Sequence, residues 1–274
     1  IKEYHLGLLR AANGKDAEAI AHFENAVAER AVAGALTETY MRAVEALARA
    51  QFKLGESEMA MKTIDDGLLI LRSYAPLVRL KAQLEAGEKV GPLITTAQQG
   101  GAEIFFNVGS AISRQGGLPF AQGHLQLARF LAPENPAILI SLADVYESQK
   151  KYILANDIYG KVPEGSAYFR RAQLEIGLNL NKLEQVPLAE ETLQKLVEED
   201  PDDILTVLSL GGVYGQHEKY AKAADLYDAA LGRISDLRSQ HWILLYRRGI
   251  AHERTQNWDQ AELDFKKALE LSPD

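Results

Sequence analysis

The sequence predicts an all-α fold of stacked helical hairpins, and three observations lead to that prediction. Small residues recur at steps of 34 residues, as in Gly109, Ala143, Gly177 and Gly211. A second small residue follows each of them after 12 residues, as Ala121 follows Gly109. Large apolar or aromatic residues fill fixed positions around both. Antiparallel helices approach closely only where side chains are small, and a period of this size is typical of units that bury one face on the next.

The N-terminal part follows the same plan more loosely. Residues 1–72 are expected to form two hairpins, with Gly7 and Ala19 at the contact of the first and Ala48 and Ala60 at the contact of the second. Residues 75–100 break the pattern and are interpreted as a degenerate hairpin, one helix followed by a short, weak second one. A linker between two arrays is the alternative interpretation of this stretch.

Residues 102–274 are expected to form five regular units. Pro119 and Pro187 fall in the first turn of a second helix, where the missing N–H does no harm. Pro163 should end the second helix of its unit about a turn early, and Gly116 suits the left-handed backbone of a hairpin turn. The sequence thus predicts about eight hairpins and sixteen helices. The five regular units are 102–135, 136–168, 169–203, 204–240 and 241–274.

Residues 208–231 and 245–274 resemble the tetratricopeptide repeat, which has small residues at positions 8, 20 and 27 and aromatic residues at positions 11 and 24. Tyr214 and Tyr227 occupy the two aromatic positions of one repeat, whereas His252 replaces the usual tyrosine in the last. The resemblance implies a right-handed α-solenoid. It also implies that positions 5 and 9 of each repeat face a concave groove that binds protein or peptide segments.

The resemblance therefore implies a partner-binding groove with an apolar spine and few charges, suited to an apolar or helical segment. The hypothesis fails if these side chains point into the core between the helix layers. The alternative is that another part of the same chain already covers the groove, because a long exposed apolar patch is a liability. The groove residues at positions 5 and 9 are Phe106, Ser110, Ile140, Asp144, Leu174, Leu178, Leu208, Gly212, Tyr246 and Ile250.

Composition excludes several classes of function. The net charge is −8 and no basic face is evident, so nucleic acid is a poor partner. The absence of cysteine excludes a disulfide scaffold, a thiolate metal site and a cysteine nucleophile. No apolar run is long enough to span a bilayer. We find no catalytic constellation, no metal-binding motif and no cofactor motif, so we do not expect an enzyme.

Residues 102–149 are also similar to long tetratricopeptide-repeat proteins of alphaproteobacteria, which implies a periplasmic, non-catalytic scaffold that supports envelope integrity. Envelope proteins would then be its partners. Two alternatives stay open: the substrate-recruiting arm of a glycosyltransferase or peptidase, and a cytosolic peptide-sensing regulator. The chain begins inside a helical pattern without an initiator Met and stops where a further repeat would turn, so we expect a segment of a longer array.

Overall fold

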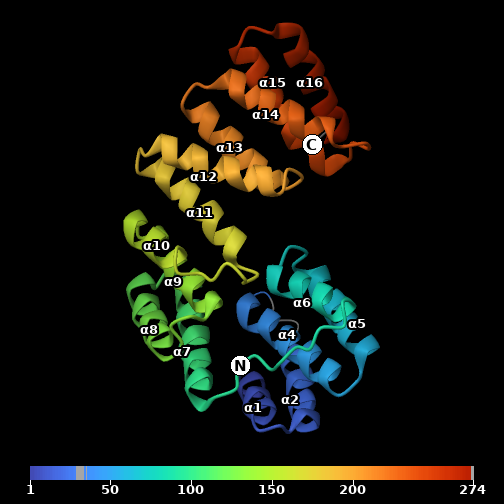
Figure 1. Cartoon of the computed structure of the whole chain (residues 1–274), viewed down its shortest axis with the longest axis vertical. Coiled ribbons are helices and arrows are strands. Elements are labelled where there is room, and N and C mark those ends of the chain that lie inside the picture. Colours follow the sequence, from blue (N-terminus) through green and yellow to red (C-terminus); the bar gives the residue numbers. More distant parts are fainter. Residues whose placement is uncertain (29–33, 35, 273–274) are drawn as a thin grey trace. The chain divides into compact units, whose positions relative to one another are not determined.

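In the computed structural model, which describes residues 1–28, 34 and 36–272, the chain forms fifteen α-helices and no strand (Figure 1). The expected all-α fold of antiparallel hairpins is confirmed. The chain divides into two compact units, Ile1–Phe169 and Arg170–Asp274, here called unit 1 and unit 2.

Unit 1 begins with two hairpins and a single helix. In the first hairpin a Cβ on Gly7 would lie 2.4 Å from the ring of Phe23, so only glycine lets the two helices approach this closely. Gly67 similarly meets Leu77 and Val44. The helices are α1 (Lys2–Ala12), α2 (Asp16–Ala28), α4 (Thr37–Lys53), α5 (Ser57–Ile70) and α6 (Ala75–Glu85).

The second helix expected within 75–100 does not form, and this corrects the prediction of a degenerate hairpin. After α6 the chain turns at Gly87, with φ +71°, but residues 88–96 stay non-helical. Pro92 disfavours helix at the residue before it and lacks an N–H, while Ile94 is buried in the core formed by α1, α2 and α4. Thr96 then starts the next helix with a capping box to Gln99.

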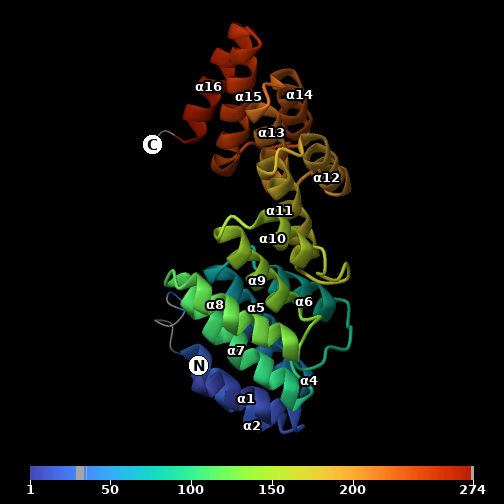
Figure 2. The ribbon, with the colours of Figure 1, turned by 90° about the vertical axis from the view of Figure 1, so that its left-hand side faces the viewer.

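The rest of unit 1 comprises α7 (Ala97–Arg114), α8 (Leu118–Leu131), α9 (Pro136–Ser148) and α10 (Tyr152–Tyr159). As expected from Pro163, α10 is short, with 8 residues against 14 in α8. Instead of stacking on α6, helix α7 contacts α1 and α4 (Figure 2). Unit 1 therefore folds back on itself.

Unit 2 is a regular succession of hairpins in which each helix packs on its neighbours. A Cβ on Gly177 would meet Leu193 at 2.7 Å, and one on Gly249 would meet Phe265 at 2.7 Å, so the small-to-large contacts follow the sequence pattern. The elements are α11 (Phe169–Lys182), α12 (Val186–Glu199), α13 (Ile204–Gln216), α14 (Tyr220–Gly232), the 3₁₀ turn η1 (Ser239–His241), α15 (Trp242–Arg254) and α16 (Trp258–Leu271).

A left-handed residue ends the first helix of each hairpin at the same place in the repeat. Gly116 adopts φ +82°, as expected, and Lys150, Glu184 and Glu218 follow at 34-residue steps with φ between 56° and 59°. Non-glycine residues rarely adopt this conformation, so the turn geometry is imposed by the packing of the hairpin.

Candidate protein-binding groove

In unit 1 the residues expected to line a groove are covered by the chain itself. Phe106 is fully buried, and the guanidinium carbon of Arg42 lies 5.4 Å from the centre of its ring. Ile140 is 2% exposed and is one of the eight buried residues of α9. The expectation that these two side chains form an exposed spine is therefore wrong. In this unit the alternative interpretation of the groove applies, in which another part of the chain covers these residues.

The two polar members of the unit 1 set are also engaged or enclosed. Asp144 accepts a hydrogen bond of 2.6 Å from the hydroxyl of Tyr159. The Ser110 hydroxyl is buried and has no hydrogen-bond partner within the described residues. Their contact with an external partner stays a prediction that this conformation does not favour.

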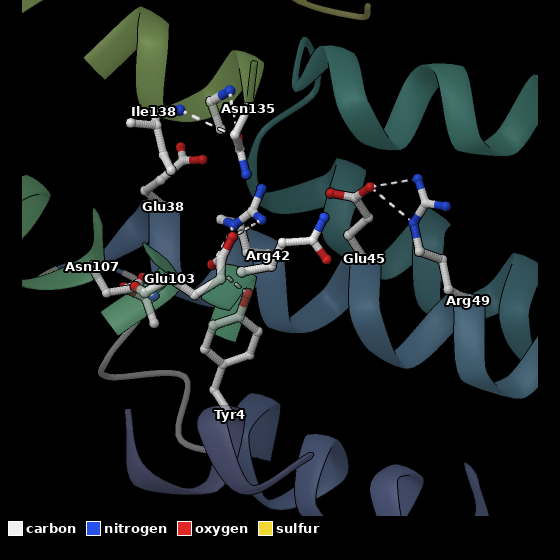
Figure 3. A network of polar contacts seen from close by, with 12 residues as sticks. Tyr4, Glu38, Arg42, Glu45, Arg49, Glu103, Asn107, Asn135 and Ile138 are labelled. Carbon is white, nitrogen blue, oxygen red and sulfur yellow. Dashed lines mark hydrogen bonds and ion pairs between the residues drawn. The ribbon is translucent and has the colours of Figure 1, made fainter. Parts of the chain in front are cut away.

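A buried polar cluster holds α7 against α1 and α4 (Figure 3). The guanidinium of Arg42 binds both oxygens of the Glu103 carboxylate, with Nε 3.0 Å from Oε2, and the Tyr4 hydroxyl donates to the same oxygen at 3.0 Å. Burial and the adjacent Glu103 carboxylate raise the pKa of Tyr4 well above its usual value. The hydroxyl therefore stays protonated and keeps donating to Glu103.

In unit 2 the expected residues separate into core and groove. Leu174 is 6% exposed and belongs to the central core, so its assignment to the groove is also wrong. Leu178 is partly buried against the same core. Tyr246 is 41% exposed, but its ring lies 6.0 Å from the ring of Trp242 and 5.9 Å from that of Phe265. These three aromatic side chains form a separate patch on the last hairpin.

An open cavity of about 430 Å³ lies between α13 and α15, with α14 behind it. Leu208, Gly212 and Ile250, three of the residues expected in the groove, line this cavity. A Cβ on Gly212 or Gly215 would meet no other atom within 4 Å, so these glycines leave an open floor along α13. We call this cavity the unit 2 groove. Its contact with a partner stays a prediction.

Two arginines that the repeat pattern did not single out also line the unit 2 groove. Arg247 and Arg254 lie seven residues apart on α15, on the same helix face as Ile243 and Ile250, and both are exposed. No carboxylate is among the lining residues. The groove is thus apolar along its floor and cationic along one wall.

Neighbouring arginines on α15 have different partners. Arg248 binds the Asp264 carboxylate through two nitrogens and the Asp228 carboxylate at 2.6 Å. Arg247 points to the groove and makes no ion pair within the described residues. The sequence presents the two as one solvated basic pair. The spacing 243, 247, 250, 254 would have revealed that Arg247 shares a face with the apolar groove residues.

Tyr227 of α14 forms the back of the unit 2 groove. It is 2% exposed, and a Cβ on Gly211 would lie 2.1 Å from its hydroxyl oxygen, so Gly211 makes room for the phenol. Burial raises the pKa of Tyr227, and the positive charge of Arg247 opposes that shift. Arg247 and Tyr227 both line the groove.

Among the described residues no group of three or more His, Asp or Glu side chains is arranged to hold a metal ion. Within the same ranges, none of the helices combines the length and hydropathy needed to cross a bilayer.

Two family models match parts of this chain. Residues 174–237 and 242–274 each match a tetratricopeptide repeat model. These residues therefore form tetratricopeptide repeats, and proteins with such repeats act as protein-interaction scaffolds that bind proteins or peptides. The unit 2 groove lies within the matched part.

Similar proteins are consistent with the repeat class. The general transcriptional corepressor ssn6 of Schizosaccharomyces pombe is 29% identical over 153 residues, which cover 52% of this chain but only 13% of that protein. The solved structure of MamA 41-end from Desulfovibrio magneticus RS-1 has a TM-score of 0.53 at 21% identity and covers 66% of this chain and 98% of its own. The MamA RS-1 ArsTM double mutant has a TM-score of 0.54 at 22% identity, covering 66% and 97%. At these identities the two structures show a shared fold.

Proposed function

We propose that this protein is a non-catalytic scaffold that binds protein segments in the unit 2 groove. The observation that supports the proposal is an open, apolar cavity bounded by two first helices, in the part of the chain that matches the repeat models. Its volume of about 430 Å³ falls within the range of about 300–1,000 Å³ that is typical of ligand sites.

The lining indicates the kind of segment that fits. Leu208 and Ile250 offer apolar contacts, and the glycine floor of α13 lets a bulky side chain approach the helix backbone. Arg247 and Arg254 attract a carboxylate at the edge of the same segment. The bound segment therefore presents apolar side chains next to an acidic one, which refines the expected apolar or helical partner.

Site-specific photo-crosslinking in native cells tests this assignment. A photoreactive amino acid at position 212 lies inside the groove, and the same group at Lys195 lies on the exposed outer helix α12. We expect protein adducts from position 212 only. Combining the photoreactive residue at position 212 with Arg247→Glu and Arg254→Glu should abolish the adducts. The matched charge reversals Lys195→Glu and Lys266→Glu, combined with the same photoreactive residue, should not. Equal adducts from both positions, or none from 212, would contradict the proposal.

We further propose that the scaffold acts in the bacterial cell envelope, in the periplasm. The similarity of residues 102–149 to envelope-associated repeat proteins supports this location. The same crosslinking experiment tests it, because the adducts at position 212 identify the compartment. Envelope proteins among the adducts are expected, and adducts with cytosolic proteins alone would remove the proposal.

A further inference from the structure

A second cavity, of about 400 Å³, lies in unit 1. Helices α4 and α6 form one side of it. The non-helical segment 89–93, the first residues of α9 and the loop 165–168 close the other sides. It lies where the start of α9 and the loop that follows α10 come near α4 and α6. We call it the unit 1 pocket.

The unit 1 pocket is cationic in a protein whose net charge is −8. Four basic side chains and a single carboxylate, that of Glu45, line it. Arg42 is held by Glu103, and Arg49 is bound to Glu45 at 2.8 Å and donates to the carbonyl of Gly91. These two arginines therefore form a fixed, paired wall (Figure 3).

The other two basic side chains are available to a ligand. Arg79 on α6 and Lys89 on the non-helical segment are exposed, and neither makes an ion pair within the described residues. They approach the pocket from two different elements. A ligand with more than one negative group can therefore be bound from both sides.

A buried hydroxyl adds a directional contact. The Oγ atom of Ser166 is shielded from solvent and has no hydrogen-bond partner within the described residues, and Ser166 lines the pocket. A hydroxyl without a partner is costly to bury, so an acceptor that reaches it gains a hydrogen bond. Asn135, by contrast, already caps α9 by accepting from the N–H groups of Ala137 and Ile138.

We propose that the unit 1 pocket binds an acidic protein segment, with carboxylates on Arg79 and Lys89 and an acceptor on the Ser166 hydroxyl. Apolar walls from Pro76, Val90 and Leu93 suit the aliphatic stems of glutamate side chains. The volume exceeds that of a single small anion and falls in the range of ligand sites. The site is independent of the unit 2 groove and would extend the scaffold to a second partner segment of different chemistry.

Isothermal titration of the full chain with a blocked pentaglutamate peptide tests the proposal. The matching pentaglutamine peptide controls for backbone binding, and inorganic phosphate and free glutamate control for a site that takes single anions. We expect pentaglutamate to bind with an affinity that falls as salt rises, because exposed charges are screened. Equal binding of pentaglutamine, or tighter binding of phosphate or free glutamate, would overturn the assignment.

Variants locate the binding to the pocket. Arg79→Ala with Lys89→Ala should weaken pentaglutamate binding about tenfold or more, the loss of two charge-assisted contacts. Lys62→Ala with Arg72→Ala makes the same charge change on exposed sites of α5 and its end, and should change the affinity less than about twofold. Equal weakening by the two pairs would attribute binding to overall charge and overturn the proposal.

Ser166→Ala separates binding from folding. The hydroxyl has no partner to lose, so the melting temperature should not fall, whereas pentaglutamate binding should weaken several-fold. A lower melting temperature with unchanged affinity would show that Ser166 is structural and would overturn its role in the pocket. If the two sites are separate, none of these variants changes the photo-crosslinking at position 212. Failure of the unit 1 pocket proposal would therefore leave the unit 2 groove proposal to be decided by the crosslinking experiment.

Discussion

Single residues next to each other in the repeat helices have opposite roles. On α13, Gly211 faces the phenol of Tyr227, whereas Gly212 faces the open groove. On α15, Arg248 is tied to two aspartates, whereas Arg247 lines the groove. A step of one residue turns a side chain by about 100° around a helix, so composition alone cannot distinguish such neighbours.

The two glycines of α13 give a direct test of this difference. Gly211→Ala should destabilise unit 2 by about 1–3 kcal/mol, because its Cβ would lie 2.1 Å from the Tyr227 hydroxyl and force repacking. Gly212→Ala, with nothing within 4 Å, should stabilise it by about 0.5–1 kcal/mol through helix propensity. Urea unfolding measures both. Equal effects of the two substitutions would show that the hairpin contact is not as tight as described.

Whether the role of a residue could be predicted from the sequence depended on what that residue contacts. The small residues were predictable because helix contact within a hairpin is local and repeats with the sequence. Leu208, Gly212 and Ile250, expected in the groove from the same spacing, line one cavity, and their contact with a partner stays a prediction. Phe106 was not predictable, because it packs beside Arg42, which lies 64 positions earlier in the sequence and belongs to a different hairpin. The 34-residue period of the sequence does not predict a contact of this kind.

At the scale of elements, helix ends are set by a few polar side chains. Asp203 begins α13 by accepting from the N–H groups of Leu205 and Thr206, and its other oxygen accepts from the Thr206 hydroxyl at 2.6 Å and from Arg170 at 2.9 Å. Burial alone would raise the pKa of Asp203, but the hydrogen bonds from Thr206 and Arg170 lower it below its usual value. The carboxylate thus joins the first helix of unit 2 to the start of α13.

Asp203→Asn should therefore lower stability in a pH-dependent way. The folded-state pKa is depressed, so the carboxylate contributes fully above its unfolded pKa of about 3.9, and the contribution is lost as pH falls through the folded value. We expect a loss of about 1 kcal/mol at pH 7 that shrinks below about pH 4. Thermal unfolding of both proteins between neutral and acidic pH measures the difference.

Asp202→Asn is the matched control for this prediction. It removes the same charge from an exposed neighbouring side chain that makes no ion pair within the described residues. We expect less than about 0.5 kcal/mol at any pH. A loss for Asp203→Asn that persists unchanged to pH 2 would assign the effect to packing and contradict the electrostatic account.

At the scale of the whole molecule, the two units differ in how closely they follow the repeat. Unit 2 follows the repeat, with helices that pack on their sequence neighbours. In unit 1 the non-helical stretch around Gly91-Pro92 interrupts the repeat, and the fold-back of α7 onto α1 and α4 is held by Arg42 and Glu103, both nearly fully buried. The all-α class and the hairpins were predictable from spacing. The fold-back was not, because the residues that determine it are isolated in sequence.

Glu103→Gln should destabilise unit 1 alone. It leaves the Arg42 guanidinium buried without its counter-charge, which costs about 3–5 kcal/mol. Chains with two compact units do not unfold in one all-or-none step, so we expect two calorimetric transitions. Glu103→Gln should lower the temperature of one transition, and Gly211→Ala should lower that of the other. The double variant should lower both temperatures by the same amounts as the single variants.

The apolar double substitution Arg42→Met with Glu103→Leu serves as the control, and should recover most of the stability lost in Glu103→Gln. A single transition shifted by both Glu103→Gln and Gly211→Ala would show that the units unfold as one body.

The fold-back also affects the order of events as the chain acquires its structure. The hydrogen bond between Tyr4 and Glu103 joins residues 99 positions apart, whereas that between Arg170 and Asp203 spans 33. Closing a long loop costs more entropy and slows the search for native contacts. We therefore expect unit 1 to complete its fold after its first hairpins have formed. During synthesis, Arg42 of α4 lacks its carboxylate partner until Glu103 has been added to the chain.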